Sequence, residues 1–283
     1  MTKKTISLLV IVMLIYILAG KTLEVYTSPA TSESMGTSVV PSELNSENKG
    51  KLEYNIMGYS SRGNMISNVI ISPINYNKTM LLTFAMHGFE GSWYNDGAAL
   101  TQIANDVIRE FSDNSAELNT TRLIVVPCVN PDGIWQGKTD NGFGRCNGQG
   151  IDINRDFDYH WEFCNDPKYR TGKAPFTTPE AQILRDLVLK EKPDIVIDFH
   201  GWLNCTYGDA ELGKYFNKNF GINNQNPISK DQVYLQQYFT GWASQFARTI
   251  MIEYPNPVNP QNLIQWDYSN KTINSIKEIC SKI

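Results

Sequence analysis

Two histidines and one glutamate in this 283-residue chain have the residue types and spacing of metal ligands. His87 and His200 each end an apolar run and are each followed by glycine, and Glu90 comes three residues after His87. Two imidazoles and one carboxylate leave the fourth position of a tetrahedral zinc ion open for water, as in catalytic zinc sites. Zinc lowers the pKa of such a water to about 7, which a closed four-ligand site cannot do.

The competing interpretation is a structural histidine in the core that forms a hydrogen bond with a nearby backbone group, because the short pattern H-x-x-E also arises by chance. For His87 alone the two interpretations are evenly balanced, and the second strand-end histidine, His200, favours the metal site. The third histidine, His160, lies in the segment DFDYHWEF without a comparable setting. We interpret His160 as structural.

Three further charged residues could act on a substrate. Arg145 and the pair Asn154-Arg155 lie in a glycine-rich segment, where a guanidinium group can bind a carboxylate through two hydrogen bonds. Surface salt bridges are the alternative for these arginines. Glu253 ends the apolar run TIMIEY, and a carboxylate beside a metal-bound water is a candidate general base. An exposed strand-end glutamate is the alternative for Glu253.

Alternating apolar strands and amphipathic helices must position these residues. Residues 64–72 alternate like a strand, and continuous apolar runs predict buried strands at 79–86, 121–131, 193–201 and 247–255. Apolar spacing predicts helices at 95–111, capped by Asn95 or Asp96, and at 178–192, capped by Thr178 with Pro179 in its first turn. This order predicts an α/β fold with three α/β/α layers around a mixed, largely parallel sheet. Functional residues in such folds gather at the carboxyl ends of the strands.

Composition and the N-terminal segment narrow the class of protein. The net charge of -4 shows no basic nucleic-acid footprint. Lys3 and Lys4 precede an apolar run of about 14 residues, which suits a secretory signal better than a full membrane span. We therefore expect a signal peptide or N-terminal membrane anchor at 1–26, a flexible polar linker at 27–50 and a catalytic domain at 51–283. The protein would be secreted or membrane-anchored and extracellular.

The five cysteines are an odd number without a C-x-x-C pair, so they indicate neither a zinc cluster nor a disulfide framework. One bridge, between Cys146 and Cys164, remains open.

The order of these features resembles the zinc carboxypeptidase family, the carboxypeptidase A/B-like metallopeptidases that include bacterial murein-peptide amidases. The resemblance is carried by His87-x-x-Glu90, then NPDG, then Arg145 with GIDINRDF, then His200, and finally Glu253. It runs from about residue 54 to 255, and five motifs in this order are specific. The resemblance implies the fold named above and one Zn²⁺ per chain. We expect the protein to be a monomer.

The resemblance also implies roles for the metal site. His87, Glu90 and His200 match the zinc ligands. Glu253 matches the general base that activates a zinc-bound water and passes a proton to the leaving amine.

Three further residues match the family's substrate contacts. Arg145 matches the arginine that polarises the scissile carbonyl and stabilises its oxyanion. Asn154 and Arg155 match the pair that holds the substrate's terminal carboxylate.

Other positions depart from the family's pattern. The tyrosine that caps the substrate could be Tyr234 or Tyr238, and neither aligns cleanly. The specificity-pocket position falls at Thr240, whose neutral side chain argues against a preference for basic side chains. The sequence NRDF replaces the usual NRNF, so Asp156 is expected to alter the charge of the site's rim.

The resemblance implies a metallocarboxypeptidase that cleaves the peptide bond next to a free C-terminal carboxylate, with a peptidoglycan stem peptide as a candidate substrate. A γ-D-glutamyl-diaminopimelate amidase is one alternative. An N-acyl amino acid deacylase of the aspartoacylase kind is another, although Arg145 and the late Glu253 favour the peptidase. A non-catalytic peptide-binding module on this fold is a third, and the complete set of ligands and base argues against it.

Overall fold

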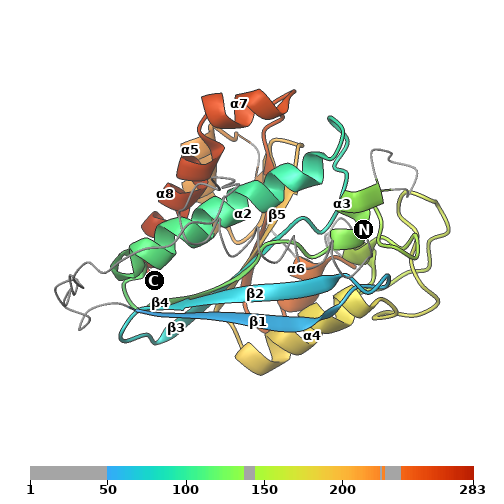
Figure 1. Cartoon of the computed structure of the whole chain (residues 1–283), viewed down its shortest axis with the longest axis horizontal. Helices are drawn as coiled ribbons and strands as arrows, with labels where there is room; N and C mark the ends of the chain where they lie inside the picture. Colours follow the sequence, from blue (N-terminus) through green and yellow to red (C-terminus); the bar gives the residue numbers. More distant parts are fainter. Residues whose placement is uncertain (1–49, 137–143, 224, 227–236) are drawn as a thin grey trace, which may run out of the picture. The chain divides into compact units, whose positions relative to one another are not determined.

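The computed structural model of the chain describes residues 50–136, 144–223, 225–226 and 237–283 (Figure 1). The predicted N-terminal segment 1–26, nearly all of the predicted linker 27–50 and Tyr234 lie outside these described residues. Within the described ranges, no helix combines the length and apolar character needed to cross a membrane.

A mixed sheet forms the middle layer of the protein. Its strands are ordered β1-β2-β4-β3-β5-β8-β6-β7. Strands β4, β3, β5 and β8 run parallel to one another, whereas β1 with β2, β2 with β4 and β6 with β8 are antiparallel pairs. The bounds are β1 Lys51–Tyr59, β2 Met65–Ser72, β3 Lys78–Phe84, β4 Thr121–Val126, β5 Ile195–Gly201, β6 Cys205–Gly208, β7 Gln225–Asn226 and β8 Arg248–Tyr254.

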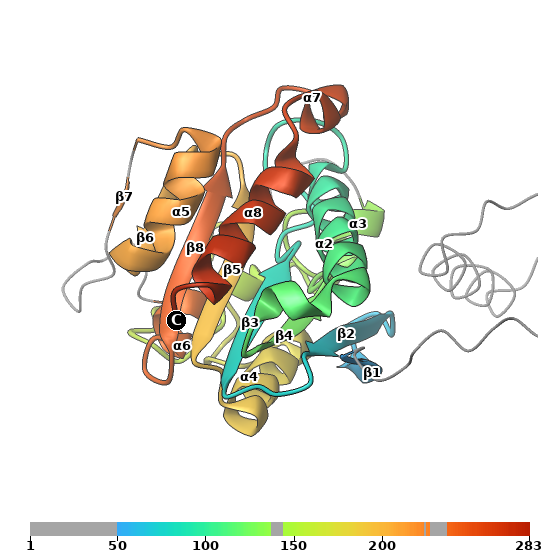
Figure 2. The ribbon, with the colours of Figure 1, turned by 90° about the vertical axis from the view of Figure 1, so that its left-hand side faces the viewer.

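Helices cover both faces of this sheet. Helices α2 (Asp96–Asp113), α5 (Ala210–Phe220) and α8 (Tyr268–Cys280) pack on one face, the one towards the viewer in Figure 2. Helices α4 (Pro179–Glu191) and α6 (Phe239–Ala243) pack on the other face. Short helices complete the chain: α3 (Pro131–Gln136), α7 (Pro260–Gln265), η2 (Ser115–Leu118) and η3 (Ile153–Arg155). The predicted three-layer α/β/α class is therefore confirmed.

Side-chain alternation along the strands divides the interior into two cores. In β5, Ile195, Ile197 and Phe199 join the core beneath α2 and α8, whereas Val196 joins the core beneath α4 and α6. Successive strand residues face opposite sides of a sheet, so Asp198 and His200 lie on the same face as Val196. The chemically active residues of β5 thus stand on the α4 side, where the apolar core ends.

The elements predicted from apolar patterns are present. The strands expected at 64–72, 79–86, 193–201 and 247–255 are β2, β3, β5 and β8, and the two helices are α2 and α4. The strand expected at 121–131 is β4, but it ends at Val126, before Pro127, so the last five expected residues are not strand. The Thr178 hydroxyl accepts a hydrogen bond from the Ala181 backbone and caps α4 as expected. Asn95 is the N-cap of α2, but its side chain makes no capping bond. Cys146 and Cys164 are free, so the bridge considered between them is not formed.

Candidate metal centre and active site

Three parallel strands bring the candidate site together at one edge of the sheet. Strands β3, β5 and β8 end at Phe84, Gly201 and Tyr254, and their carboxyl ends lie side by side because the strands are parallel. His87 follows the end of β3 by three residues, and His200 is the penultimate residue of β5. Gly88, the next residue, allows the backbone of Gly133 to approach closely, since a Cβ at Gly88 would lie 2.1 Å from the Gly133 carbonyl carbon.

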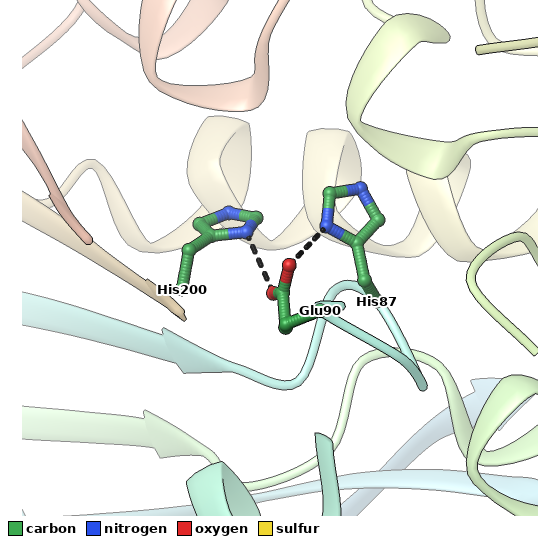
Figure 3. A group of neighbouring side chains, drawn as sticks. All are labelled: His87, Glu90 and His200. Atoms are coloured by element: carbon green, nitrogen blue, oxygen red, sulfur yellow. Dashed lines mark hydrogen bonds and ion pairs between the residues drawn. The ribbon is translucent and has the colours of Figure 1, made fainter. Parts of the chain in front are cut away.

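The three predicted ligands meet at the Glu90 carboxylate (Figure 3). Glu90 Oε2 lies 3.1 Å from His87 Nδ1, and Glu90 Oε1 lies 3.1 Å from His200 Nδ1. One donor atom from each residue lies within 4.8 Å of the other two. All three side chains are at most 3% exposed. Burial opposes ionisation of Glu90, but the adjacent imidazoles outweigh it and hold the pKa of this carboxyl well below its usual range.

Asp96, the first residue of α2, shapes the loop that carries Glu90. Its carboxylate accepts hydrogen bonds from the backbone N–H groups of Glu90 (2.6 Å) and Ser92 (2.8 Å) and from the Trp202 indole (3.0 Å). Trp202 follows His200 by two residues, so one buried carboxylate connects both ligand-bearing segments. Burial raises the pKa of Asp96, against the hydrogen bonds that lower it. The sequence indicated Asp96 only as a helix cap.

Each ligand histidine has a second carboxylate on its other ring nitrogen. Asp152 Oδ1 lies 2.9 Å from His87 Nε2, and Asp198 Oδ2 lies 2.8 Å from His200 Nε2. Both aspartates are fully buried. Such partners orient a metal-binding imidazole and fix its tautomer. Sequence reasoning missed both, although each is an acid in a motif that contains a predicted site residue.

The two predicted arginines lie on the Asp152 side of the centre. Arg145 Nη2 is 3.4 Å from Asp152 Oδ2, and Arg145 Nη1 is 3.6 Å from Glu90 Oε2. Asn130 of the NPDG motif donates from its side chain to the Arg145 carbonyl (3.1 Å) and from its backbone to the Ala85 carbonyl (3.0 Å). Asn130 thereby joins the end of β3 to the arginine. Arg145 Nε has no partner among the described residues.

Arg155 lies close to two tyrosine rings. Its Nη1 is 3.8 Å from Asp152 Oδ2, and its Nη2 donates to the Tyr238 hydroxyl (3.2 Å). The guanidinium carbon lies 4.2 Å from the ring centre of Tyr238 and 5.2 Å from that of Tyr169. Of the two tyrosines considered for the substrate, Tyr238 therefore contacts the predicted anchor, and Tyr234 lies outside the described residues.

Glu253 lies in β8, beside the candidate metal ligands. The register between β5 and β8 pairs it with His200. Its Oε2 is buried and has no partner in the part of the chain that the structure describes. Burial raises the pKa of the Glu253 carboxyl to about 7, against the lowering effect of His200. A carboxylate with a pKa near neutral is suited to accept and return protons.

Asn154 and Thr240 are both buried. The Asn154 oxygen accepts from the Phe239 backbone (2.9 Å), and its nitrogen lies 3.5 Å from His200 Nε2. Thr240 lies in α6, next to Phe239, and its hydroxyl has no partner among the described residues. His160 does not belong to the candidate ligand group.

The expectation that Asp156 alters the rim charge is wrong. Asp156 is fully buried, where it accepts hydrogen bonds from the Thr177 hydroxyl and from the backbone and hydroxyl of Thr178. The turn of η3 directs it towards the start of α4. Asp156 therefore has a structural role at the start of α4 and does not contribute charge to the rim of the site.

The residues of this centre fit a zinc ion. Two imidazole nitrogens and a carboxylate oxygen are ligands that zinc accepts, and both imidazoles have the outer carboxylate typical of zinc sites. With both imidazoles neutral, four ionised carboxylates and two guanidinium groups leave two negative charges uncompensated in this buried site: those of Glu90, Asp152, Asp198 and Glu253 against Arg145 and Arg155. A divalent cation would neutralise that excess, which burial makes costly.

An α/β fold that carries this ligand set beside a buried carboxylate, one oxygen of which has no partner among the described residues, defines the class of zinc metallohydrolases. The family model for zinc carboxypeptidases, peptidase family M14, matches residues 40–275, and the chain belongs to this family. The recognition made from the motifs is confirmed.

Individual relatives agree with the family. Bacteriocin BCN5 of Clostridium perfringens is 31% identical over 232 residues, which is 79% of this chain and 25% of the relative. Murein peptide amidase A of Escherichia coli (strain K12) is 33% identical over 113 residues, which is 35% of this chain and 44% of the relative. The chain thus matches less than half the length of either relative.

The carboxypeptidase A structure from Helicoverpa armigera superposes with a TM-score of 0.65 at 17% identity, covering 81% of this chain and 68% of that one. At this identity the likeness supports the fold alone.

Proposed function

We propose that this chain is a zinc-dependent metallocarboxypeptidase that hydrolyses the peptide bond next to a free C-terminal carboxylate. The observation that carries the proposal is the buried Glu253 carboxylate beside His200, whose Oε2 has no hydrogen-bond partner among the described residues. A buried carboxylate oxygen without a partner costs stability, so its presence next to three candidate ligands supports a catalytic use.

The residues of the centre divide the reaction among them. His87, Glu90 and His200 would hold the zinc ion, which supplies a Lewis acid that lowers the pKa of water to about 7. Glu253 accepts the proton of the attacking water and returns it to the leaving amine. Arg145 donates to the oxygen on which negative charge develops, which contributes about 2.7 to 4 kcal/mol for one donor in comparable sites.

Arg155 and Asn154 would bind the substrate's terminal carboxylate. Arg155 Nη2 donates a hydrogen bond to the Tyr238 hydroxyl, and the Tyr238 ring packs against the guanidinium group and helps to hold it in place. A planar guanidinium group can grip a carboxylate through two parallel bonds. The anchor would therefore set which amide bond of a peptide lies beside Glu253.

We propose peptides of the bacterial cell wall as the substrate class. Support comes from the similarity to murein peptide amidase A and from the basic and apolar sequence of residues 1–26, which predicts export. The same similarity favours a second candidate reaction, cleavage of a γ-D-glutamyl-diaminopimelate bond. Both reactions cleave an amide next to a free carboxylate, so the same arrangement of arginines serves either.

A panel of substrates tests these proposals. Stem-peptide fragments, linear peptides with a free or amidated C-terminus, and N-acyl amino acids would be incubated with the zinc-loaded protein, with and without a chelator. Loss of one C-terminal residue, read as a product mass, supports the carboxypeptidase, and cleavage at γ-D-glutamate supports the amidase. Cleavage confined to N-acyl amino acids would indicate the deacylase. Absence of hydrolysis throughout the panel would overturn the enzyme assignment.

We also propose export, supported by the basic and apolar N-terminal segment. Cell fractionation with an antibody to the catalytic domain tests it. A protein in the medium supports secretion, and one in the membrane fraction supports an anchor. A protein confined to the cytosol would overturn the proposal.

A further inference from the structure

We infer that Thr83, Asp198 and His200 form a hydrogen-bonded chain that holds His200 in the orientation and tautomer needed for metal binding. Asp198 is then a positioning residue that acts through His200. The inference depends on the metal centre and not on the substrate or reaction proposed above.

The geometry of the chain is continuous. The Thr83 hydroxyl donates to Asp198 Oδ1 (2.6 Å), and Asp198 Oδ2 lies 2.8 Å from His200 Nε2. The parallel register of β3 and β5 pairs Thr83 with Asp198. All three side chains are buried, with Thr83 and Asp198 completely inaccessible to solvent. Two rigid strands therefore fix each of the contacts.

The carboxylate selects the tautomer of His200. An ionised carboxylate only accepts hydrogen bonds, so Nε2 must carry a proton and donate the hydrogen bond to Asp198. A neutral ring then has its lone pair on Nδ1, the nitrogen that faces Glu90 Oε1 at 3.1 Å. That is the nitrogen from which a metal shared with Glu90 would be bound.

Without Asp198 the surroundings would favour the opposite tautomer. The Asn154 side-chain nitrogen lies 3.5 Å from His200 Nε2, and its amide orientation is set because the Asn154 oxygen accepts from the Phe239 backbone. An amide donor at Nε2 favours a lone pair there and a proton on Nδ1. Glu90 would accept a hydrogen bond from that Nδ1–H, and the proton would block the metal-binding nitrogen.

Asp198 differs from the corresponding carboxylate at the other histidine. Asp152 also lies 3.4 Å from Arg145 and 3.8 Å from Arg155, so its charge is shared with two guanidinium groups. Among the described residues, the ion pair found for Asp198 is the one with His200. Its charge therefore acts mainly on the imidazole, and replacing it need not displace an arginine.

The test measures metal affinity. The metal-free protein would be titrated with zinc against a chromophoric chelator, for the natural chain and for Asp198→Asn and Thr83→Val. Removal of an outer carboxylate typically weakens metal binding about 10- to 100-fold, which is the loss expected for Asp198→Asn. Thr83→Val should give a smaller loss, because the carboxylate remains but is less firmly held.

A matched control lies just before the same strand. Asp194 precedes the amino end of β5, away from His200, where it pairs with Lys78 (3.3 Å) and accepts from the Thr79 backbone. Asp194→Asn makes the same chemical change and should leave zinc affinity unchanged. Cobalt absorption spectra provide a second reading, since a reoriented His200 should alter the bands in Asp198→Asn but not in Asp194→Asn.

The outcomes are distinct. A folded Asp198→Asn protein with the affinity and cobalt spectrum of the natural chain would overturn the inference. Should that variant not fold, Thr83→Val decides: weakened binding supports the chain, and unchanged binding overturns it. A natural chain that binds zinc but cleaves no peptide would overturn the proposed function and not this inference, because the quantity measured in this test is zinc affinity.

Discussion

Glu253 lies directly opposite His200 in the parallel register of β8 and β5. Paired residues of neighbouring strands point to the same face of a sheet, so the carboxylate stands beside the candidate metal ligand. On its other side, the antiparallel register pairs Glu253 with Cys205 of β6. The sheet register thus places the buried Glu253 carboxylate next to the candidate metal centre. Burial raises the pKa of this carboxyl to about 7.

Glu253→Gln should abolish most turnover while leaving zinc bound. Glutamine keeps the size of the side chain but cannot accept a proton from water, and Glu253 is not among the ligands. General-base catalysis contributes about 10²- to 10⁴-fold, so kcat should fall by that factor. Turnover and zinc content of the purified variant check this. The exposed Glu211→Gln serves as control, and full activity in Glu253→Gln would refute the assignment.

His200→Ala should lose the metal. The variant removes one of three ligand atoms that lie within 4.8 Å of one another and leaves an open, weaker site. Zinc per chain, measured by mass spectrometry after dialysis, should fall well below one. His160→Ala is the matched control and should keep its zinc, because His160 lies outside the ligand group. One zinc per chain in His200→Ala would show that the ligand set is wrong.

The metal ligands could be predicted because they depend on local pattern. His87 and His200 each end an apolar run, and the carboxyl ends of parallel strands share one edge of a sheet. The buried strands β3, β5 and β8 are recognisable from continuous apolar residues. The four-residue strand β6 carries no comparable signal. Helix α8 does carry one, because its buried Ile273, Ile276 and Ile279 follow helical spacing, and the sequence reasoning missed it.

The outer residues could not be predicted because they depend on register and on turns. Asp198 shares a strand face with His200, which alternation indicates, but only the pairing of β3 with β5 shows Thr83 beside it. Asp152 and Asp156 flank the Asn154-Arg155 pair, yet Asp152 contacts His87 whereas Asp156 points to Thr178 at the start of α4. A sequence pattern does not distinguish these two directions.

Arg155→Ala should weaken the use of substrates with a free C-terminal carboxylate. A hydrogen bond to a charged group contributes about 1.5 to 3 kcal/mol, which corresponds to about 10- to 150-fold in kcat/KM. Most of the effect should appear in KM, since the anchor also binds the ground state. The check compares acid and amidated forms of one peptide. Arg185→Ala, on α4, is the control, and equal losses on both peptide forms would contradict an anchoring role.

Asp156 allows a prediction about pH that does not involve the metal. Burial raises the pKa of its carboxyl, although hydrogen bonds from Thr178 and Thr177 lower it. A carboxyl whose pKa is raised by folding binds more protons in the folded than in the unfolded state between the two pKa values. Its contribution to stability is therefore greatest at low pH and is lost as pH rises through the folded-state pKa.

Asp156→Asn should consequently cost more stability near pH 4 than near pH 7. Asparagine does not titrate, and its amide nitrogen cannot accept the Thr178 or Thr177 bonds, so the variant is destabilised by about 1 to 3 kcal/mol at the acid end. Urea unfolding of both proteins across this range gives the difference in the free energy of unfolding. Asp158→Asn, at an exposed neighbouring position, is the control. A difference that grows with pH would contradict the raised pKa.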